Sequence, residues 1–95
     1  MRSYELMTIH RPDLAEDDVR ALVSGISGFL GERGATVAGT DLWGKRRFAY
    51  EINHLTEGYY SVITFQGDAA LVADLDRMLS LADEVVRHKV FRPEG

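Results

Sequence analysis

The chain has 95 residues, of which 45% are hydrophobic, and it carries a formal net charge of −4. A chain of this length predicts one domain, residues 1–95, with a single small core. It contains no cysteine, which excludes disulfides and thiolate metal ligands. No apolar run approaches the roughly 20 residues that span a bilayer, and no apolar signal segment follows Met1. We therefore expect a cytoplasmic protein with no membrane partner.

The charges are distributed unevenly along the chain. Two segments predicted below as helices, residues 13–33 and 67–84, hold ten acidic and three basic side chains. The remainder holds eight basic and five acidic side chains. A chain that is acidic overall can therefore present one basic surface, formed by the segments between the helices.

The N-terminal part is predicted to form a strand and then a helix. Residues 2–10 alternate with both sides partly apolar, which is typical of a central strand. Pro12 ends this strand because proline lacks the N–H group that a sheet ladder needs. Asp13 and Glu16 match a capping box, and apolar residues then recur at spacings of three and four, so we expect a helix over residues 13–33.

The middle of the chain is predicted to be extended. Gly34 is expected to end the first helix, after which residues 35–42 resume strand-like sequence and continue into residues 43–52. Gly44 permits a bulge or a bend at this junction. From position 45 to 52 the apolar residues fall mostly on every second position, the period of a half-buried strand: Phe48, Tyr50 and Ile52.

The C-terminal half is predicted to contain a loop, two strands and a helix. Residues 53–58 are polar and end in glycine, which indicates a loop. Residues 59–65 are dense in aromatic and β-branched side chains, which favour a strand. A second helix is expected over residues 67–84, with Asp68 as its N-cap, followed by a last strand over residues 85–91.

The order β-α-β-β-α-β predicts an α+β fold. Each helix has one apolar stripe that it can bury only against one face of a four-stranded antiparallel sheet, and right-handed crossovers select the ferredoxin-like arrangement. The other sheet face stays uncovered, and an apolar uncovered face predicts a protein partner, although a single bulge would exchange the two faces. The expected outward residues are Glu5, Met7, Ile9, Tyr60, Val62, Arg87, Lys89 and Phe91. The candidates for partner binding among them are Met7, Ile9, Tyr60, Val62 and Phe91.

The stretch from Trp43 to Ile52 is the most informative segment for function. It places three consecutive cations, Lys45 to Arg47, beside three aromatic residues. Clustered cations and aromatics on a sheet suit a phosphate backbone and unstacked bases. An edge strand that keeps cations to prevent edge-to-edge pairing explains the same residues equally well.

Two weaker RNA-binding patterns have simpler explanations. Residues 31–34 match the four-residue loop that clamps RNA in KH domains, but a helix end accounts for them better. Residues 57–65 partly match the strand of an RNA-recognition motif, yet Glu57 stands where that motif has a cation.

No pattern of catalytic or metal-binding residues is present in the sequence. His10, His54 and His88 belong to separate predicted elements, and we expect His88 to be the most tightly packed of them. Gly44-Lys45 lacks the preceding glycine and the following helix of a phosphate-binding loop. We therefore expect no enzyme, no cofactor, no metal and no small-molecule substrate.

Four motifs resemble the bacterial small-subunit ribosomal protein S-six family, and together they cover nearly the whole chain. The motifs are Arg2-x-Tyr4-Glu5, Trp43-Gly44-Lys45-Arg46-Arg47-Phe48-Ala49-Tyr50-Glu51-Ile52, Gly58-Tyr59-Tyr60 and Val86-Arg87-His88-Lys89-Val90. Glu51 stands where the family often has proline.

The resemblance implies a ferredoxin-like structural protein of the small ribosomal subunit, located in the cytoplasm. It also implies binding to the central domain of small-subunit ribosomal RNA, made jointly with ribosomal protein S-eighteen. The positions that match the family motifs and are expected to face RNA are Arg2, Tyr4, Lys45, Arg46, Arg47, Tyr50 and Arg87. Lys89 and Arg92 join them on charge and position alone.

The alternative function class is a small ferredoxin-like enzyme or a dimeric ligand-binding regulatory domain. An acylphosphatase-type enzyme needs a phosphate loop after the first strand, and Arg11-Pro12-Asp13 offers no glycine-rich cradle of that kind. A regulatory domain would dimerise through the open sheet face, which a sedimentation experiment would detect.

Overall fold

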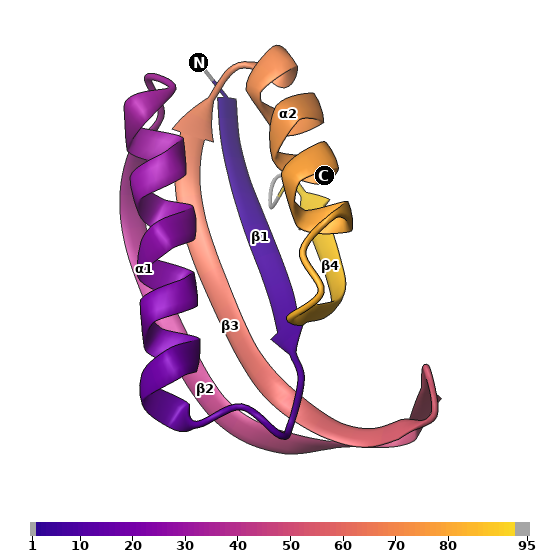
Figure 1. Cartoon of the computed structure of the whole chain (residues 1–95). Coiled ribbons are helices and arrows are strands. Elements are labelled where there is room, and N and C mark those ends of the chain that lie inside the picture. The colour runs from indigo at the N-terminus through magenta and orange to yellow at the C-terminus, as the bar shows by residue number, and fades with distance from the viewer. Residues whose placement is uncertain (1, 93–95) are drawn as a thin grey trace.

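The computed structural model describes residues 2–92 and contains four strands and two helices. The elements are β1 (Arg2–His10), α1 (Glu16–Glu32), β2 (Thr36–Ile52), β3 (Leu55–Gly67), α2 (Ala69–Ser80) and β4 (Val85–Phe91). The strands form one antiparallel sheet in the order β2-β3-β1-β4, and both helices cover the same face of it (Figure 1). This arrangement confirms the predicted ferredoxin-like α+β fold.

The start of α1 differs from the prediction, because the capping box does not form. The N-cap is Ala15, and no side chain caps the helix. Pro12 instead lies in a turn in which the Leu14 N–H group donates to the Arg11 carbonyl at 3.4 Å. Within this turn the Asp13 carboxylate pairs with the Arg11 guanidinium at 3.1 Å, so it is not available to the helix N-terminus.

The end of α1 matches the prediction. Gly34 has a φ of +89°, a conformation that glycine adopts without strain. Its N–H group donates to the Gly31 carbonyl, and the N–H group of Ala35 donates to the Leu30 carbonyl. This pair of hydrogen bonds is a Schellman motif, which satisfies carbonyls that the helix leaves free.

The predicted loop over residues 53–58 is wrong, because β2 and β3 form one long hairpin. The turn consists of Asn53 and His54 alone, with φ values of 49° and 65°, and Ile52 pairs with Leu55 across it. Two successive residues with positive φ match the twist of a two-residue hairpin. This hairpin extends beyond the end of β1 and curves (Figure 1), and its tip reaches β4, where the Asn53 amide donates to the Val86 carbonyl at 3.4 Å.

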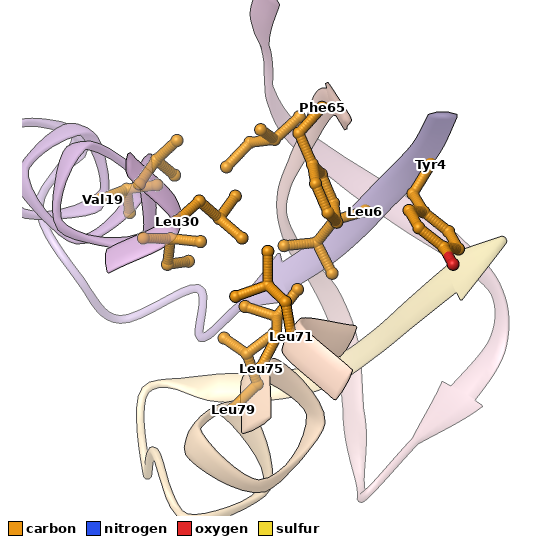
Figure 2. Close-up of a cluster of buried hydrophobic side chains, with 11 residues drawn as sticks. Tyr4, Leu6, Val19, Leu30, Phe65, Leu71, Leu75 and Leu79 are labelled. Carbon is orange, nitrogen blue, oxygen red and sulfur yellow. The ribbon is translucent and has the colours of Figure 1, made fainter. Parts of the chain in front are cut away.

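The core lies between the helices and one face of the sheet. Figure 2 shows leucines and a valine of α1 and α2 converging on side chains from β1 and β3. Tyr4 and Leu6 of β1 lie on this face, and Tyr4 stacks on Phe65 of β3 with ring centroids 5.5 Å apart. The buried apolar cluster consists of Tyr4, Leu6, Val19, Val23, Ile26, Leu30, Ile63, Phe65, Leu71, Leu75 and Leu79.

The core face also buries a histidine that the sequence did not single out. His10 is 0% exposed, whereas His88 keeps some exposure and pairs with the Asp76 carboxylate at 2.9 Å. The prediction that His88 packs most tightly is therefore wrong. The reason lies in the alternation of β1, which places His10 on the same face as Leu6 and Thr8.

Burial determines the titration of His10. Desolvation lowers the pKa of the His10 imidazole below its ordinary value of 6.5, and the Glu84 carboxylate and the Tyr59 backbone oppose this shift. A lowered pKa keeps the ring neutral at pH 7. Neither ring nitrogen has a hydrogen-bond partner of normal geometry among residues 2–92.

Replacement of Gly58 by alanine is expected to destabilise the protein. The added Cβ would lie 2.7 Å from Cγ2 of Ile9 and 2.8 Å from the His10 carbonyl oxygen, which belongs to the backbone and cannot move aside. We expect the free energy of unfolding to fall by about 1–3 kcal/mol, measured by urea denaturation. The control is Gly28→Ala, where the new Cβ meets nothing within 4 Å and stability should rise by up to about 1 kcal/mol. Equal stability of the two variants would contradict the close packing at Gly58.

Stability is expected to decrease on acidification through pH 6.5. The unfolded chain binds a proton at His10 near this pH, while the native state binds it only at lower pH because its pKa is lowered. The free energy of unfolding should therefore fall with pH, by at most about 1.4 kcal/mol per pH unit from this group. Urea denaturation at several pH values between about 7.5 and about 5 measures the slope of the free energy of unfolding against pH. The slope should diminish in His10→Phe and persist in the exposed control His54→Gln; identical slopes in all three proteins would contradict the assignment to His10.

Candidate nucleic-acid and partner interface

A bulge in β2 determines which side chains reach the open face of the sheet. Leu42 pairs with Ser61 and Gly44 pairs with Tyr60, so Trp43 is an extra residue without a partner in β3. Gly44 has a φ of +85°, which an L-residue adopts only with strain. The insertion reverses the alternation that follows, and it brings Trp43 and Arg46 to the same face. The predicted bulge at Gly44 is confirmed.

Trp43 and Arg46 belong to a cluster with two aromatic rings, Phe48 and Tyr60, which we call the aromatic–arginine cluster. The rings of Trp43 and Tyr60 stack with centroids 6.1 Å apart and an interplanar angle of 9°. The Arg46 guanidinium lies over the Trp43 ring, 5.4 Å from its centroid, and Phe48 contacts Tyr60 edge-on at 6.0 Å. The indole N–H group donates to the Asp41 carboxylate at 3.1 Å, which fixes the ring orientation. Trp43 is nevertheless 43% exposed, so the cluster presents aromatic surface to a ligand.

The strand register places the predicted outward residues together on one face. Residues opposite each other in an antiparallel pair point to the same side. Ile9 in β1 lies between Tyr60 and Arg87, and Met7 lies between Val62 and Lys89. A third row contains Glu5, Thr64 and Phe91. The predicted orientation of the sheet is therefore confirmed, whereas the binding roles of these residues stay predictions.

Ile9 and Tyr4 are positioned differently from the other candidates. Ile9 is on the open face but only 2% exposed, and its side chain lies close to the Gly58 backbone of the hairpin. Tyr4 is 6% exposed in the core and has no free ring face. By contrast, Tyr50 is 75% exposed, so the prediction that it lies on a half-buried strand face is wrong, and its ring is free to stack.

The structure groups some of the basic candidates and separates others. Arg46 lies opposite Gly58 in β3, on the same face as Arg87 and Lys89 of β4. The hairpin tip contacts β4 at Val86, one residue before Arg87. The end of the open face near this contact therefore carries cations from both β2 and β4. Arg87 and Lys89 therefore lie on the same face as the aromatic–arginine cluster, which contains Arg46, and the two groups form one surface.

The remaining basic candidates lie away from that surface. Lys45 opposes Tyr59, on the helix side of the sheet, and its ammonium lies 5.1 Å from the centroid of that ring. Arg47 follows in the hairpin and opposes Glu57. At the opposite end of the sheet, Arg2 begins β1 and Arg92 follows β4, and the antiparallel pairing brings these two ends together.

Trp43 was absent from the sequence-derived candidates, although it begins the central stretch. Strict alternation would put Trp43, Lys45 and Arg47 on one face and Arg46 on the other. The signal that could have identified Trp43 is the following Gly44, since a bulge at that glycine places Trp43 and Arg46 on the same face of the sheet.

Among residues 2–92, no three His, Asp or Glu side chains gather in a way that could hold a metal ion. No helix in this part of the chain is long and apolar enough to cross a bilayer. The fold and the surface define a small ferredoxin-like protein whose candidate site is an open sheet face with aromatic and cationic side chains.

Comparison with known proteins identifies the family. The model of the family described as ribosomal protein S6 matches residues 3–92. Small ribosomal subunit protein bS6 of Symbiobacterium thermophilum is 47% identical over 93 residues, covering 98% of each chain, and that of Desulforamulus reducens is 44% identical over 92 residues, covering 97% of each. The crystal structure of 30S ribosomal protein S6 from Thermotoga maritima superimposes with a TM-score of 0.92 at 32% identity, covering 98% of this chain and 88% of the other. The chain belongs to the ribosomal protein S6 family, the family that its sequence motifs resemble.

Replacement of Gly44 by alanine is expected to disturb the aromatic–arginine cluster. A Cβ at a φ of +85° should lower the free energy of unfolding by about 1–2 kcal/mol. Trp43 is the only tryptophan, so its fluorescence and near-ultraviolet circular dichroism report directly on the cluster. Both spectra should change in Gly44→Ala and stay unchanged in Gly39→Ala, where a Cβ meets nothing within 4 Å and φ is not positive. Unchanged tryptophan spectra in Gly44→Ala would contradict the role assigned to the bulge.

Proposed function

We propose that this protein is a structural component of the small ribosomal subunit, in the cytoplasm, and binds the central domain of small-subunit ribosomal RNA jointly with ribosomal protein S-eighteen. Membership of the ribosomal protein S6 family over residues 3–92 supports the ribosomal role. The observation that carries the RNA-binding part is the open face on which Arg46, Arg87 and Lys89 accompany the exposed ring of Trp43.

The cations neutralise phosphates and the aromatic rings stack on unpaired bases. Lysine and arginine at phosphates provide affinity without sequence preference, whereas stacking selects unpaired nucleotides. Tyr50 adds an exposed ring to the same strand of the hairpin as Arg47. Arg2 and Arg92 extend the basic footprint at the far end of the sheet. Lys45, on the helix side of the hairpin, contacts RNA that passes around its edge.

The protein partner covers the apolar middle of the same face. Met7 and Val62 are adjacent there, and Phe91 is 38% exposed beside them. Tyr60 connects this strip to the aromatic–arginine cluster. A footprint with few cations binds RNA weakly by itself, so a basic partner on the strip would complete one preassembled RNA-binding surface. The acidic helices, on the opposite side, repel RNA and leave the open face as the side of contact.

Binding to a central-domain ribosomal RNA fragment tests this proposal. We expect tight binding only when ribosomal protein S-eighteen is present, with affinity that decreases steeply between two salt concentrations. The double variant Arg46→Ala, Arg47→Ala should weaken binding and reduce the salt slope by about 1–2. The matched control is Arg77→Ala, which removes an exposed cation from α2 on the helix side.

Two outcomes would contradict the proposal. Unchanged affinity and salt slope in the double variant would remove the central cations from the interface. Absence of RNA binding by the folded wild-type protein with its partner would reject the function, and sedimentation would then test for a dimer through the open face.

A further inference from the structure

A hollow with a volume of about 180 Å³ lies between the N-terminal half of α1 and the β2–β3 hairpin. Val19 of α1 lines one side of it, and Leu42 and Tyr59 of the hairpin line the other. Gly44, at the bulge, also contributes to the lining. Leu42 opposes the buried Ser61, on the side of the sheet that carries the helices, and β2 is an edge strand. The hollow therefore lies behind the open face, at the free edge of β2.

Two side chains of opposite charge line the same hollow. Glu16 and Arg20 are one turn of α1 apart, so both reach it from the same face of the helix. Both residues are exposed, and the ion pairs among residues 2–92 join other side chains. A ligand in the hollow therefore meets a carboxylate acceptor and a guanidinium donor side by side, and both are open to solvent.

The hairpin side of the hollow offers an aromatic ring and a cation. Tyr59 is half-buried, and the Lys45 ammonium lies 5.1 Å from the centroid of its ring. Asp17 and Asp18, the other acidic residues in the first turn of α1, do not line the hollow. An anionic group is therefore favoured on the hairpin side, beside Lys45, and a group with hydrogen-bond donors is favoured on the helix side, beside Glu16.

We propose that this hollow binds the base of an unpaired guanine nucleotide of RNA, an inference that rests on the proposed RNA-binding function and adds a base-selective site to it. The ring N1–H group and the 2-amino group of guanine donate to the Glu16 carboxylate, and the Arg20 guanidinium donates to O6. Lys45 pairs with the phosphate of the nucleotide, outside the hollow.

The Watson–Crick edge of guanine matches this pair of side chains. It carries an acceptor followed by two adjacent donors, an order that adenine, cytosine and uracil lack. Sequence-specific recognition of unpaired RNA bases uses this edge. A carboxylate has two oxygens that accept from two adjacent donors at once, and the neighbouring guanidinium is left for the acceptor.

The size of the hollow fits a base without its sugar. A volume of about 180 Å³ exceeds the roughly 150 Å³ that accommodates benzene and lies below the roughly 300 Å³ of the smallest pockets for drug-sized ligands. The sugar and phosphate therefore stay at the edge of β2, where Lys45 lies. RNA that passes around this edge thus inserts one base and keeps its backbone on the hairpin.

The pentaribonucleotide 5′-UUGUU is a suitable probe for the site. Its titration into the full-length, isotope-labelled chain should shift the amide resonances of Val19, Gly44 and Tyr59, with a dissociation constant on the order of 1 mM or tighter. The same oligonucleotide with inosine in place of guanosine lacks only the 2-amino group and should bind at least about 3-fold more weakly. Guanosine monophosphate, the free form of the ligand, should also bind at least about 3-fold more weakly than 5′-UUGUU, because it brings only one phosphate.

Two pairs of variants locate the contacts. Glu16→Ala should abolish the preference for guanosine over inosine, whereas Asp17→Ala, which removes the same charge from the same turn, should retain it. Because each preference is a ratio measured within one variant, the general gain in RNA affinity from a lost carboxylate cancels. Arg20→Ala should weaken 5′-UUGUU binding at least about 3-fold, and Arg77→Ala, an exposed cation of α2, should leave it unchanged.

The proposal is overturned if the guanosine and inosine oligonucleotides bind equally, or if Glu16→Ala and Asp17→Ala retain the same preference. It is also overturned if guanosine monophosphate binds as tightly as 5′-UUGUU, since the ligand would then be a free nucleotide. None of these titrations contains the central-domain fragment or the protein partner. Joint binding of that fragment without a guanosine preference would therefore reject this site alone, whereas loss of joint binding would reject the proposed function.

Discussion

The position of β1 in the sheet is the constraint on which the rest of the structure depends. It pairs with β3 along one edge and with β4 along the other, so it is a central strand with no free edge over most of its length. Leu6 and Thr8 point to the helices, while Met7 and Ile9 point to the open face. The core under the helices and the candidate binding surface therefore lie on the two faces of β1. A shift of its register by one residue would exchange the side chains on these faces.

The order of the elements and the orientation of the sheet could be predicted from the sequence, because the hydrophobic period of each segment and the right-handedness of the crossovers determine them. The details around the site could not. A bulge in β2 changes which of its side chains share a face. The face on which Arg46 lies can be determined only from the pairing of β2 with β3. Tyr50 fits the period of a half-buried strand, yet nothing within residues 2–92 covers it. A local pattern does not encode which distant residues will cover a side chain. The burial of His10 was overlooked because His88 was expected to be the most tightly packed histidine, whereas strand parity places His10 in the core.

The sheet separates two chemically different sides. Arg87 and Lys89 lie on the open side with exposed aromatic surface, and the acidic helices lie on the other. This arrangement reconciles a net charge of −4 with a cationic binding face, since a ligand experiences the local potential more strongly than the total charge. Within the helical side, Arg33 pairs with Asp74 at 2.7 Å and connects α1 to α2. The acidic layer is thus partly neutralised between the helices.

The pairing of β1 with β3 and β4 also determines the order in which the chain can fold during synthesis. The first residues to be made have no strand to pair with until β3 is complete, because β2, which precedes β3 in the chain, does not contact β1 in the sheet order. Meanwhile α1 contains three glycines and gains its stability from packing on the sheet. The full pairing of β1 with β3 therefore needs residue 67 to have emerged, and folding of β1 depends on closure of long-range contacts.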